Sequence, residues 1–119
     1  MIFVIQEHYA SHHHFDFRLE KDGVLKSWAV PKGVPAEPGV KRLAVPVEDH
    51  PLDWASFEGV ITEGYGAGSV TVWETGTYEE LQWDETRIDV HLAGERGKIQ
   101  GHYVLIPFKE NWLIFKKQV

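Results

Sequence analysis

The chain has 119 residues, no cysteine and a formal net charge of −6 at pH 7. Without cysteine it can form neither a disulfide nor a zinc site built on thiolates. Its hydrophobic content of 43% and aromatic content of 13% exclude an intrinsically disordered chain. We expect one domain over residues 1–119, with a hydrophobic core that is stable without disulfides or structural metals.

The negative charge argues against a protein that coats nucleic acid non-specifically. The cations are concentrated in residues 18–42, whereas residues 61–95 carry one cation, Arg87, among eight acidic residues. This distribution favours a local site for one or two phosphates. The sequence shows no secretory signal and no apolar run of about 20 residues, so we expect a soluble cytoplasmic protein that does not contact a membrane.

Short runs rich in β-branched and aromatic residues follow one another along the chain, which is typical of strands. The expected strands are residues 4–6, 14–20, 24–30, 43–47, 69–74, 77–83, 87–92, 101–107 and 112–117. No segment keeps an apolar period of 3.6 residues, so helix is limited to a turn or two near residues 51–57. The pattern predicts a mainly-β fold, a compact antiparallel β-barrel of about eight strands with at most one or two short helical turns.

Turn signals separate the expected strands. Asp22-Gly23 favours a tight hairpin turn because these residues accept positive φ angles, and residues 74–77 suggest a second, weaker hairpin. Residues 31–39, rich in proline and glycine, predict a long turn. The glycines of residues 64–68 predict a tight corner rather than a phosphate-binding loop, since no Walker lysine and no helix follow them.

The segment from His14 to Leu19 carries the strongest chemical signal. On a strand, alternate side chains share a face, so His14, Asp16 and Arg18 would project together, with neighbours about 6.6 Å apart at Cα. An imidazole and a carboxylate at this spacing can bind one divalent metal, and the guanidinium can hold an anion bound to that metal. His8 could fold back to add a second imidazole. The alternative is a solvated polar face of an amphipathic strand.

A mixture of imidazole and carboxylate ligands suits Mn²⁺ or Zn²⁺ better than a site for Mg²⁺ alone, and Co²⁺ is a further alternative. His12 and His13 are expected to be loop residues rather than ligands. His50 precedes a proline turn, where a lone histidine is more often structural. Lys32 and Arg42 flank the long turn, and each taken alone would be an ordinary exposed cation.

Beyond these residues, the sequence resembles the 3′-phosphoesterase domain found in bacterial DNA ligase D and as free-standing proteins. The blocks that carry the resemblance are FVIQEH (3–8), HFDFRLE (14–20), GVLKSWAVPKG (23–33), KRLAV (41–45), VEDHPLD (47–53), FEGVI (57–61), YGAG (65–68) and WLIFKK (112–117). They occur in the same order over nearly the whole chain, which makes the resemblance highly specific.

The resemblance implies a β-barrel that binds Mn²⁺ and processes the 3′ ends of nucleic acid at primer-template junctions. Such domains remove a terminal ribonucleoside to leave a 3′-phosphate, and then remove that phosphate. By position, the implied metal ligands are His8, His14 and Asp16. The residues implied to bind or act on the scissile phosphate are Arg18, Lys32, Arg42 and His50. The implied partners are nucleic acid 3′ ends and a separate ligase or polymerase of end joining.

Three features depart from the family pattern. Trp54 occupies a position where the family usually has a tyrosine, and its indole N–H could still bind the phosphate but offers no hydroxyl. Phosphomonoester cleavage should therefore suffer most. The glycine loop lacks the usual proline and is one residue shorter. We expect weak removal of ribonucleosides, because the family's N-terminal arm has no counterpart before the first strand.

Two other functions fit the same residues. His14, Asp16 and His50 match the two-histidine, one-carboxylate set of an iron oxygenase on a β-barrel, whose cosubstrate the neighbouring cations could bind. Alternatively, the chain could bind 3′ ends with little catalytic activity and recruit repair enzymes, a role that Trp54 would allow.

Overall fold

The computed structural model describes residues 1–64 and 66–118. It contains nine strands and one short 3-10 helix. The elements are β1 (Ile2–Tyr9), β2 (His13–Lys21), β3 (Val24–Val30), β4 (Lys41–His50), η1 (Leu52–Ser56), β5 (Gly59–Ile61), β6 (Gly68–Trp83), β7 (Ile88–Gly94), β8 (Gln100–Phe108) and β9 (Asn111–Lys116). Within the described residues, none of the helical structure is long and apolar enough to cross a membrane.

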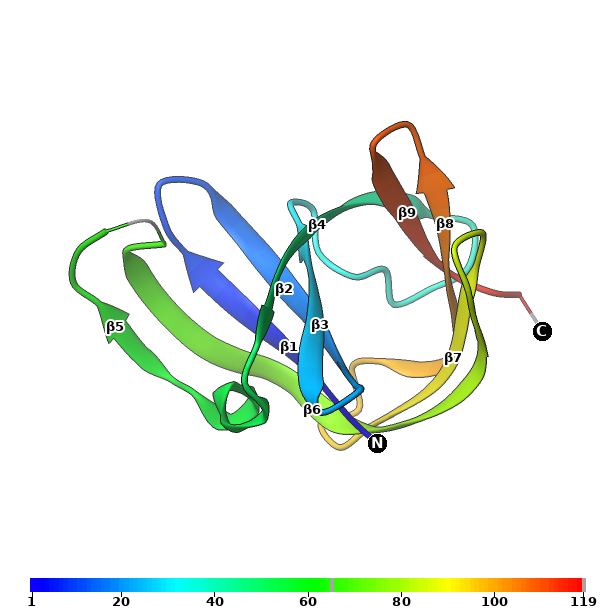
Figure 1. Cartoon of the computed structure of the whole chain (residues 1–119), viewed down its shortest axis with the longest axis horizontal. Coiled ribbons are helices and arrows are strands. Elements are labelled where there is room, and N and C mark those ends of the chain that lie inside the picture. Colours follow the sequence, from blue (N-terminus) through cyan, green and yellow to red (C-terminus); the bar gives the residue numbers. More distant parts are fainter. Residues whose placement is uncertain (65, 119) are drawn as a thin grey trace.

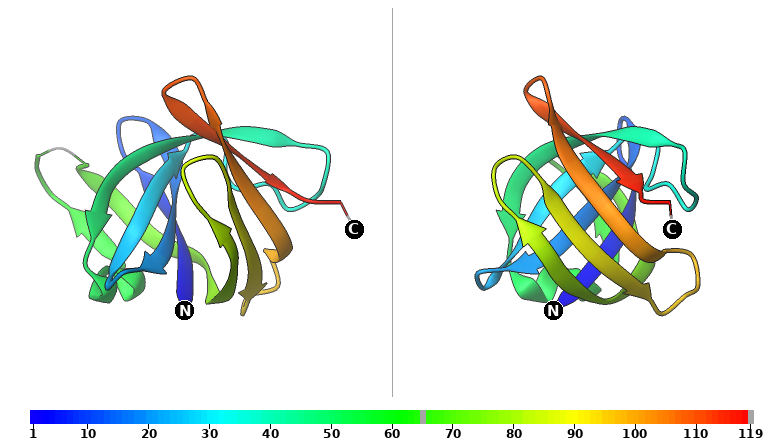
Figure 2. Two further views of the ribbon diagram at one scale, coloured as in Figure 1. Left: turned by 45° about the vertical axis from the view of Figure 1, so that its right-hand side comes forward. Right: turned by 90° about the vertical axis from the view of Figure 1, so that its right-hand side faces the viewer.

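The strands form one antiparallel sheet that closes on itself. Its order is β1-β2-β3-β4-β9-β8-β7-β6-β5, and an additional pairing of β1 with β6 closes the barrel. Eight strands therefore make the wall, while β5 lies beside β6 outside the closed ring (Figure 1). Figure 2 shows the strands tilted around this wall, as closure of a sheet requires. The predicted mainly-β barrel with one short helical turn is confirmed.

The core is made by alternate side chains of the wall strands. Phe3 and Ile5 of β1 face inward together with Phe17 and Leu19 of β2, and all four are buried. The long turn after β3 is attached to this core, because Val34 packs in it and the hydroxyl of Tyr103 donates a 2.6 Å hydrogen bond to the carbonyl of Pro35. Within the barrel, the inward face of β1 and β2 is thus apolar, which leaves the outward face for polar residues.

The hairpin predicted at Asp22-Gly23 is confirmed, since both residues have positive φ angles, 54° and 82°. The second hairpin, predicted at residues 74–77, is wrong: β6 continues through Gly76 without a turn. Gly76 pairs with Phe3 on one side and Gly94 on the other. A Cβ at this position would overlap the carbonyl oxygen of Ala93. Glycine is needed here because the neighbouring strand approaches closely. In the sequence alone, such a glycine cannot be distinguished from one in a turn.

The pairing of β1 with β6 shifts by one residue between Ile5 and Gln6. Ile5 pairs with Glu74 and Gln6 with Val72, so Trp73 is the extra residue of a bulge. Beyond this bulge the β1–β2 hairpin, the first part of β6 and β5 extend to one side of the barrel (Figure 1). Bulges bend strands and increase their twist, and this one separates the barrel from the extension that carries His8 and His14.

Glu74 fixes the bulge from inside. Its side chain is fully buried, and one carboxylate oxygen accepts hydrogen bonds from the backbone N–H groups of Thr75 and Arg96. The other oxygen accepts from those of Lys98 and Ile99, so the β7–β8 turn is bound to β6. Burial raises the pKa of Glu74, but these four hydrogen bonds outweigh burial and leave the pKa below its ordinary value.

We expect Glu74→Gln to lower the free energy of unfolding at pH 7 by about 1–3 kcal/mol, because an amide cannot accept four backbone hydrogen bonds. A carboxylate whose pKa is lowered by folding stabilises the protein above the pKa of unfolded glutamate. That contribution is lost as the pH falls through the folded pKa, so wild type and variant should converge in acid.

Urea unfolding at pH 7 and at acidic pH measures the difference. Glu79→Gln, an exposed change on the same strand, is the matched control. Equal unfolding free energies for wild type and Glu74→Gln at pH 7 would contradict this role.

Candidate metal and phosphate site

A row of polar side chains occupies the outward face of β1 and β2, beside the extension of the barrel. The register pairs Val4 with Arg18, Gln6 with Asp16 and His8 with His14. Since side chains alternate along a strand, these residues lie on the face opposite the core residues. Gln6, His8, Asp16 and Arg18 are nevertheless buried. A buried polar face on the outside of a barrel marks a built site rather than a solvated surface.

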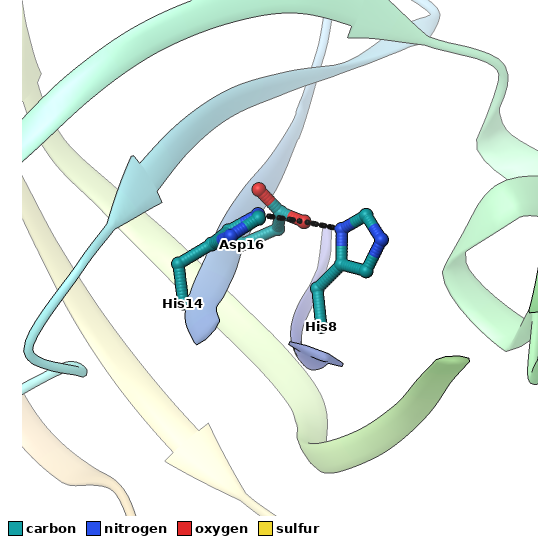
Figure 3. Close-up of side chains that lie close together, drawn as sticks. All are labelled: His8, His14 and Asp16. Carbon is teal, nitrogen blue, oxygen red and sulfur yellow. Dashed lines mark ion pairs between the residues drawn. The ribbon is translucent and has the colours of Figure 1, made fainter. Parts of the chain in front are cut away.

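His8, His14 and Asp16 converge. Nδ1 of His8 lies 3.6 Å from Oδ2 of Asp16, and Nε2 of His14 lies 3.3 Å from the same oxygen. The potential ligand atoms of the three residues all lie within 4.8 Å of one another. Figure 3 shows the two imidazoles on either side of the carboxylate, each with a nitrogen directed toward it. The predicted convergence of His8 with the β2 residues is confirmed, and the set fits a divalent cation.

Backbone carbonyls orient both imidazoles. Nε2 of His8 lies 2.7 Å from the carbonyl oxygen of Gly66, and Nδ1 of His14 lies 2.9 Å from that of His12. A carbonyl oxygen only accepts, so these nitrogens carry the hydrogens. In the neutral rings, Nδ1 of His8 and Nε2 of His14 keep free lone pairs on the side of Asp16. Metal-binding histidines are commonly oriented in this way, and no sequence pattern pointed to either carbonyl.

The electrostatics favour a charged carboxylate at the centre. Burial raises the pKa of Asp16, but His14 and Arg18 outweigh it and leave the pKa below its ordinary value. The hydrogen bond with Asp16 raises the pKa of His14, against the opposing effect of burial. Without a cation the site therefore attracts a proton to His14, and a metal ion would compete with that proton.

Arg18 lies between the three residues and His50. Its side chain is 5% exposed. Its Nε donates a 2.7 Å hydrogen bond to Gln6, and one terminal nitrogen donates a 2.9 Å bond to Ser27. The other terminal nitrogen lies 3.5 Å from Oδ2 of Asp16. The guanidinium is thus held as a rigid planar fork, the form of cation best suited to a phosphate.

His50 ends β4 on the far side of Arg18. Its Nδ1 lies 3.1 Å from a terminal nitrogen of Arg18 and 3.0 Å from the carbonyl of Glu48. Burial, followed by the charge of Arg18, lowers the pKa of His50, so its imidazole is neutral at pH 7. Two of the residues that the resemblance implies for the phosphate, Arg18 and His50, are thus in contact.

Trp54 of η1 forms the adjoining wall. Its ring centroid is 5.5 Å from that of His50, and it stacks on Phe57 at 4.2 Å with an interplanar angle of 8°. Nε2 of Gln6 donates to the backbone carbonyls of both Trp54 and Phe57. Gln6 therefore links Arg18 to this wall, and neither Gln6 nor Ser27 was identified from the sequence. Buried amide side chains are nearly always hydrogen-bonded, but this rule can be applied only when the structure has shown that the side chain is buried.

Lys32 and Arg42 have a different environment. One terminal nitrogen of Arg42 donates to the carbonyls of Lys32 and Gly33, at 2.7 and 3.1 Å, and so stabilises the turn after β3. The side chain of Lys32 is exposed. Among the residues the structure describes, the ion pairs of Asp16 are with His8, His14 and Arg18, and neither Lys32 nor Arg42 takes part in them. Their predicted action on a phosphate stays a prediction.

The iron-oxygenase set of His14, Asp16 and His50 is not assembled. The second imidazole that joins His14 and Asp16 is that of His8. The Arg18 guanidinium contacts both Asp16 and His50, so a cation stands where a shared metal ion would have to bind. Tyr65, which belongs to the glycine-rich block of the sequence, lies outside the described residues.

Residues 6–107 match the family model described as the DNA ligase D 3′-phosphoesterase domain. A multifunctional non-homologous end joining DNA repair protein LigD from Mycobacterium tuberculosis is 50% identical over 117 residues, which cover 93% of this chain and 15% of that protein. A multifunctional non-homologous end joining protein LigD from Pseudomonas aeruginosa is 52% identical over 110 residues, covering 87% of this chain and 13% of that protein.

A third relative, the protein of the same name from Mycolicibacterium smegmatis, is 43% identical over 122 residues, covering 93% of this chain and 16% of that protein. The chain thus spans about a sixth or less of the length of these relatives. The match nevertheless includes all residues of the polar site, from Gln6 to Trp54. The chain belongs to the DNA ligase D 3′-phosphoesterase domain family.

Proposed function

We propose that this chain is a metal-dependent phosphoesterase that trims the 3′ ends of DNA or RNA strands during the repair of DNA breaks. One observation carries the proposal: the Asp16 carboxylate oxygen is shared by two oriented imidazoles and a buried, rigid guanidinium. The carboxylate and the imidazoles suit a divalent cation, and the guanidinium suits a phosphate. Family membership supports phosphate-ester hydrolysis as the reaction.

His8, His14 and Asp16 would hold the cation, and we propose Mn²⁺ as its identity, with Zn²⁺, Co²⁺ and Mg²⁺ as alternatives. When bound, such an ion polarises a phosphoryl oxygen and lowers the pKa of a bound water. The ordering of both imidazoles before binding reduces the conformational entropy that the site loses when it captures the ion.

Arg18 would bind the non-bridging oxygens of the scissile phosphate and neutralise the charge that develops on them. Its Nε and one terminal nitrogen are already engaged by Gln6 and Ser27, so the guanidinium does not have to reorganise during the reaction. Lys32 and Arg42 would complete the anion-binding subsite. The side chain of Lys32 is exposed in the turn after β3. Arg42 would contribute by holding the turn that carries Lys32.

His50 has two roles open to it, general acid for the leaving group and hydrogen-bond donor to the phosphate. The lowered pKa means that the imidazole carries one proton at pH 7, which makes it a weak acid but a good neutral donor. We therefore assign phosphate binding to His50, beside Arg18. Trp54 would close this side of the subsite with its indole.

The biological setting follows from the relatives, which are named as end joining and DNA repair proteins. We propose that the processed 3′ ends pass to a ligase and a polymerase of end joining, which are the partners of this step. The proposed location is the cytoplasm, where a bacterial chromosome is repaired.

The direct test uses a labelled primer-template ending in either a 3′-ribonucleotide or a 3′-phosphate, with Mn²⁺ and with chelator. We expect shortened or dephosphorylated primer only with metal, and no product from His14→Ala although its circular dichroism is unchanged. His91→Ala, an exposed histidine of β7, should behave as wild type. Turnover in chelator would contradict the proposal, whereas tight binding without product would assign the chain to end recognition.

Metal binding should weaken as the pH falls. When His14 is protonated, the proton on Nε2 must leave before this nitrogen can bind a cation. The hydrogen bond with Asp16 raises the pKa of His14 above the ordinary value for histidine. Below this pKa, the apparent affinity for Mn²⁺ should drop about tenfold per pH unit. Titration calorimetry between pH 8.5 and 5.5 measures it, with His102→Ala as the control. An affinity independent of pH would rule out His14 as a ligand.

Trp54→Tyr should raise phosphomonoester cleavage about tenfold, because a phenol hydroxyl next to His50 can donate a charge-assisted hydrogen bond worth about 1.5 kcal/mol or more. Trp54→Phe, which keeps the aromatic wall but adds no hydroxyl, is the matched control. Phosphate release from a 3′-phosphate primer measures the effect. Equal rates for the two variants would show that the hydroxyl has no part in this step.

A further inference from the structure

The tip of the β1–β2 hairpin carries an exposed aromatic pair that the proposed chemistry does not use. Tyr9 and His13 are directly opposite each other in the register of the two strands. Their rings stack at a centroid distance of 4.3 Å with an interplanar angle of 7°. Tyr9 is 52% exposed and the side chain of His13 is 47% exposed. Two parallel rings thus project into solvent at the end of a hairpin.

This pair adjoins the metal site along the strands. The next pair inward is His8 with His14, two of the three converging residues. One residue along a strand is about 3.3 Å, and neighbouring side chains lie on opposite faces. The hairpin therefore presents the metal site on one face and the stacked rings on the other. Figure 1 shows this hairpin extending beyond the barrel, so a nucleic acid strand can pass over its tip.

The pair is held in place rather than loosely exposed. Nε2 of His13 lies 2.8 Å from a carboxylate oxygen of Glu7. The His13 ring also contacts Phe15 at a centroid distance of 5.4 Å, and Phe15 in turn meets Trp73 edge-on at 5.4 Å. An aromatic row therefore runs from the hairpin tip back to the bulge of β6. Rings fixed before binding lose little conformational entropy on stacking.

A cation lies along the same route. Phe15 pairs with Val30, the last residue of β3, and the turn that follows carries the exposed Lys32. Stacked rings beside a cation form the usual recognition surface for unpaired nucleotides, since bases stack on the rings and phosphates meet the charge. Two parallel, exposed rings next to a phosphate subsite therefore suit a nucleotide rather than a peptide.

We propose that Tyr9 and His13 form a stacking platform for the first unpaired nucleobase beside the 3′ end that the site processes. The inference rests on the proposed function and adds a determinant of substrate choice: the platform selects junctions with an unpaired base over blunt ends. Tyr9 supplies the ring face that the base covers, and His13 supports that ring from behind.

Fluorescence anisotropy in chelator, where no turnover occurs, tests the platform with three labelled duplexes. One has a recessed 3′ end and an unpaired template base, the second has an abasic residue in place of that base, and the third is blunt. Wild type should bind the first about tenfold more tightly than the others. Tyr9→Ala should lose this preference and Tyr9→Phe should keep it, because stacking needs the ring and not the hydroxyl.

Phe108→Ala is the matched control, since Phe108 is a 42% exposed aromatic residue next to the tip of another hairpin, β8–β9. It should bind all three duplexes as wild type does. Equal preference in wild type and Tyr9→Ala would overturn the platform, and so would an equal loss of affinity for all three duplexes. If wild type cleaves 3′ ends yet shows no preference, the platform fails alone. If it binds none of the duplexes, the proposed function fails with it.

Discussion

The register between β1 and β2 is the constraint on which the site depends. It places His8 opposite His14 and Gln6 opposite Asp16, while Phe3 and Ile5 enter the core. A slip of one residue would turn the apolar side chains of a strand outward and its polar ones into the core. Burial of the apolar face therefore fixes the positions of the ligand groups. The same free energy that closes the barrel assembles the metal site.

Two ionisable groups, His8 and Asp16, and one permanent cation, Arg18, are buried on this face beside the partly exposed His14, which would be unfavourable without compensation. The compensation is mutual: Asp16 contacts both imidazoles and Arg18, and Arg18 is further satisfied by Gln6. Gln6 extends the network to η1 through the carbonyl of Trp54. The helical turn has no buried residue of its own, and this amide attaches it to the site together with the contact between Trp54 and His50. The Gln6 side chain therefore holds both η1 and the Arg18 guanidinium in place.

The sequence predicted the parts of this site that follow from alternation along one strand. His14, Asp16 and Arg18 were placed correctly because a period of two residues fixes their face whatever the rest of the fold does. The carbonyl of Gly66 that orients His8 is contributed by a distant segment, which no local pattern reveals. Gly76 was misread for a related reason, since glycine marks both turns and close strand contacts and only the neighbour, β7, distinguishes them.

The extension beyond the β6 bulge explains why a small barrel can act on the end of a large polymer. The interior of this eight-stranded barrel is filled by its own side chains, among them Phe3, Phe17 and Tyr103. Here the chain instead lengthens β1, β2 and β6 past the closed ring, and the bulge at Trp73 directs them to one side. Functional groups on this extension stay attached to a rigid wall, yet both faces of the hairpin reach solvent. A strand end can approach such a site without threading into a cavity, and the groups that bind phosphate are already fixed by the hydrogen bonds of the barrel.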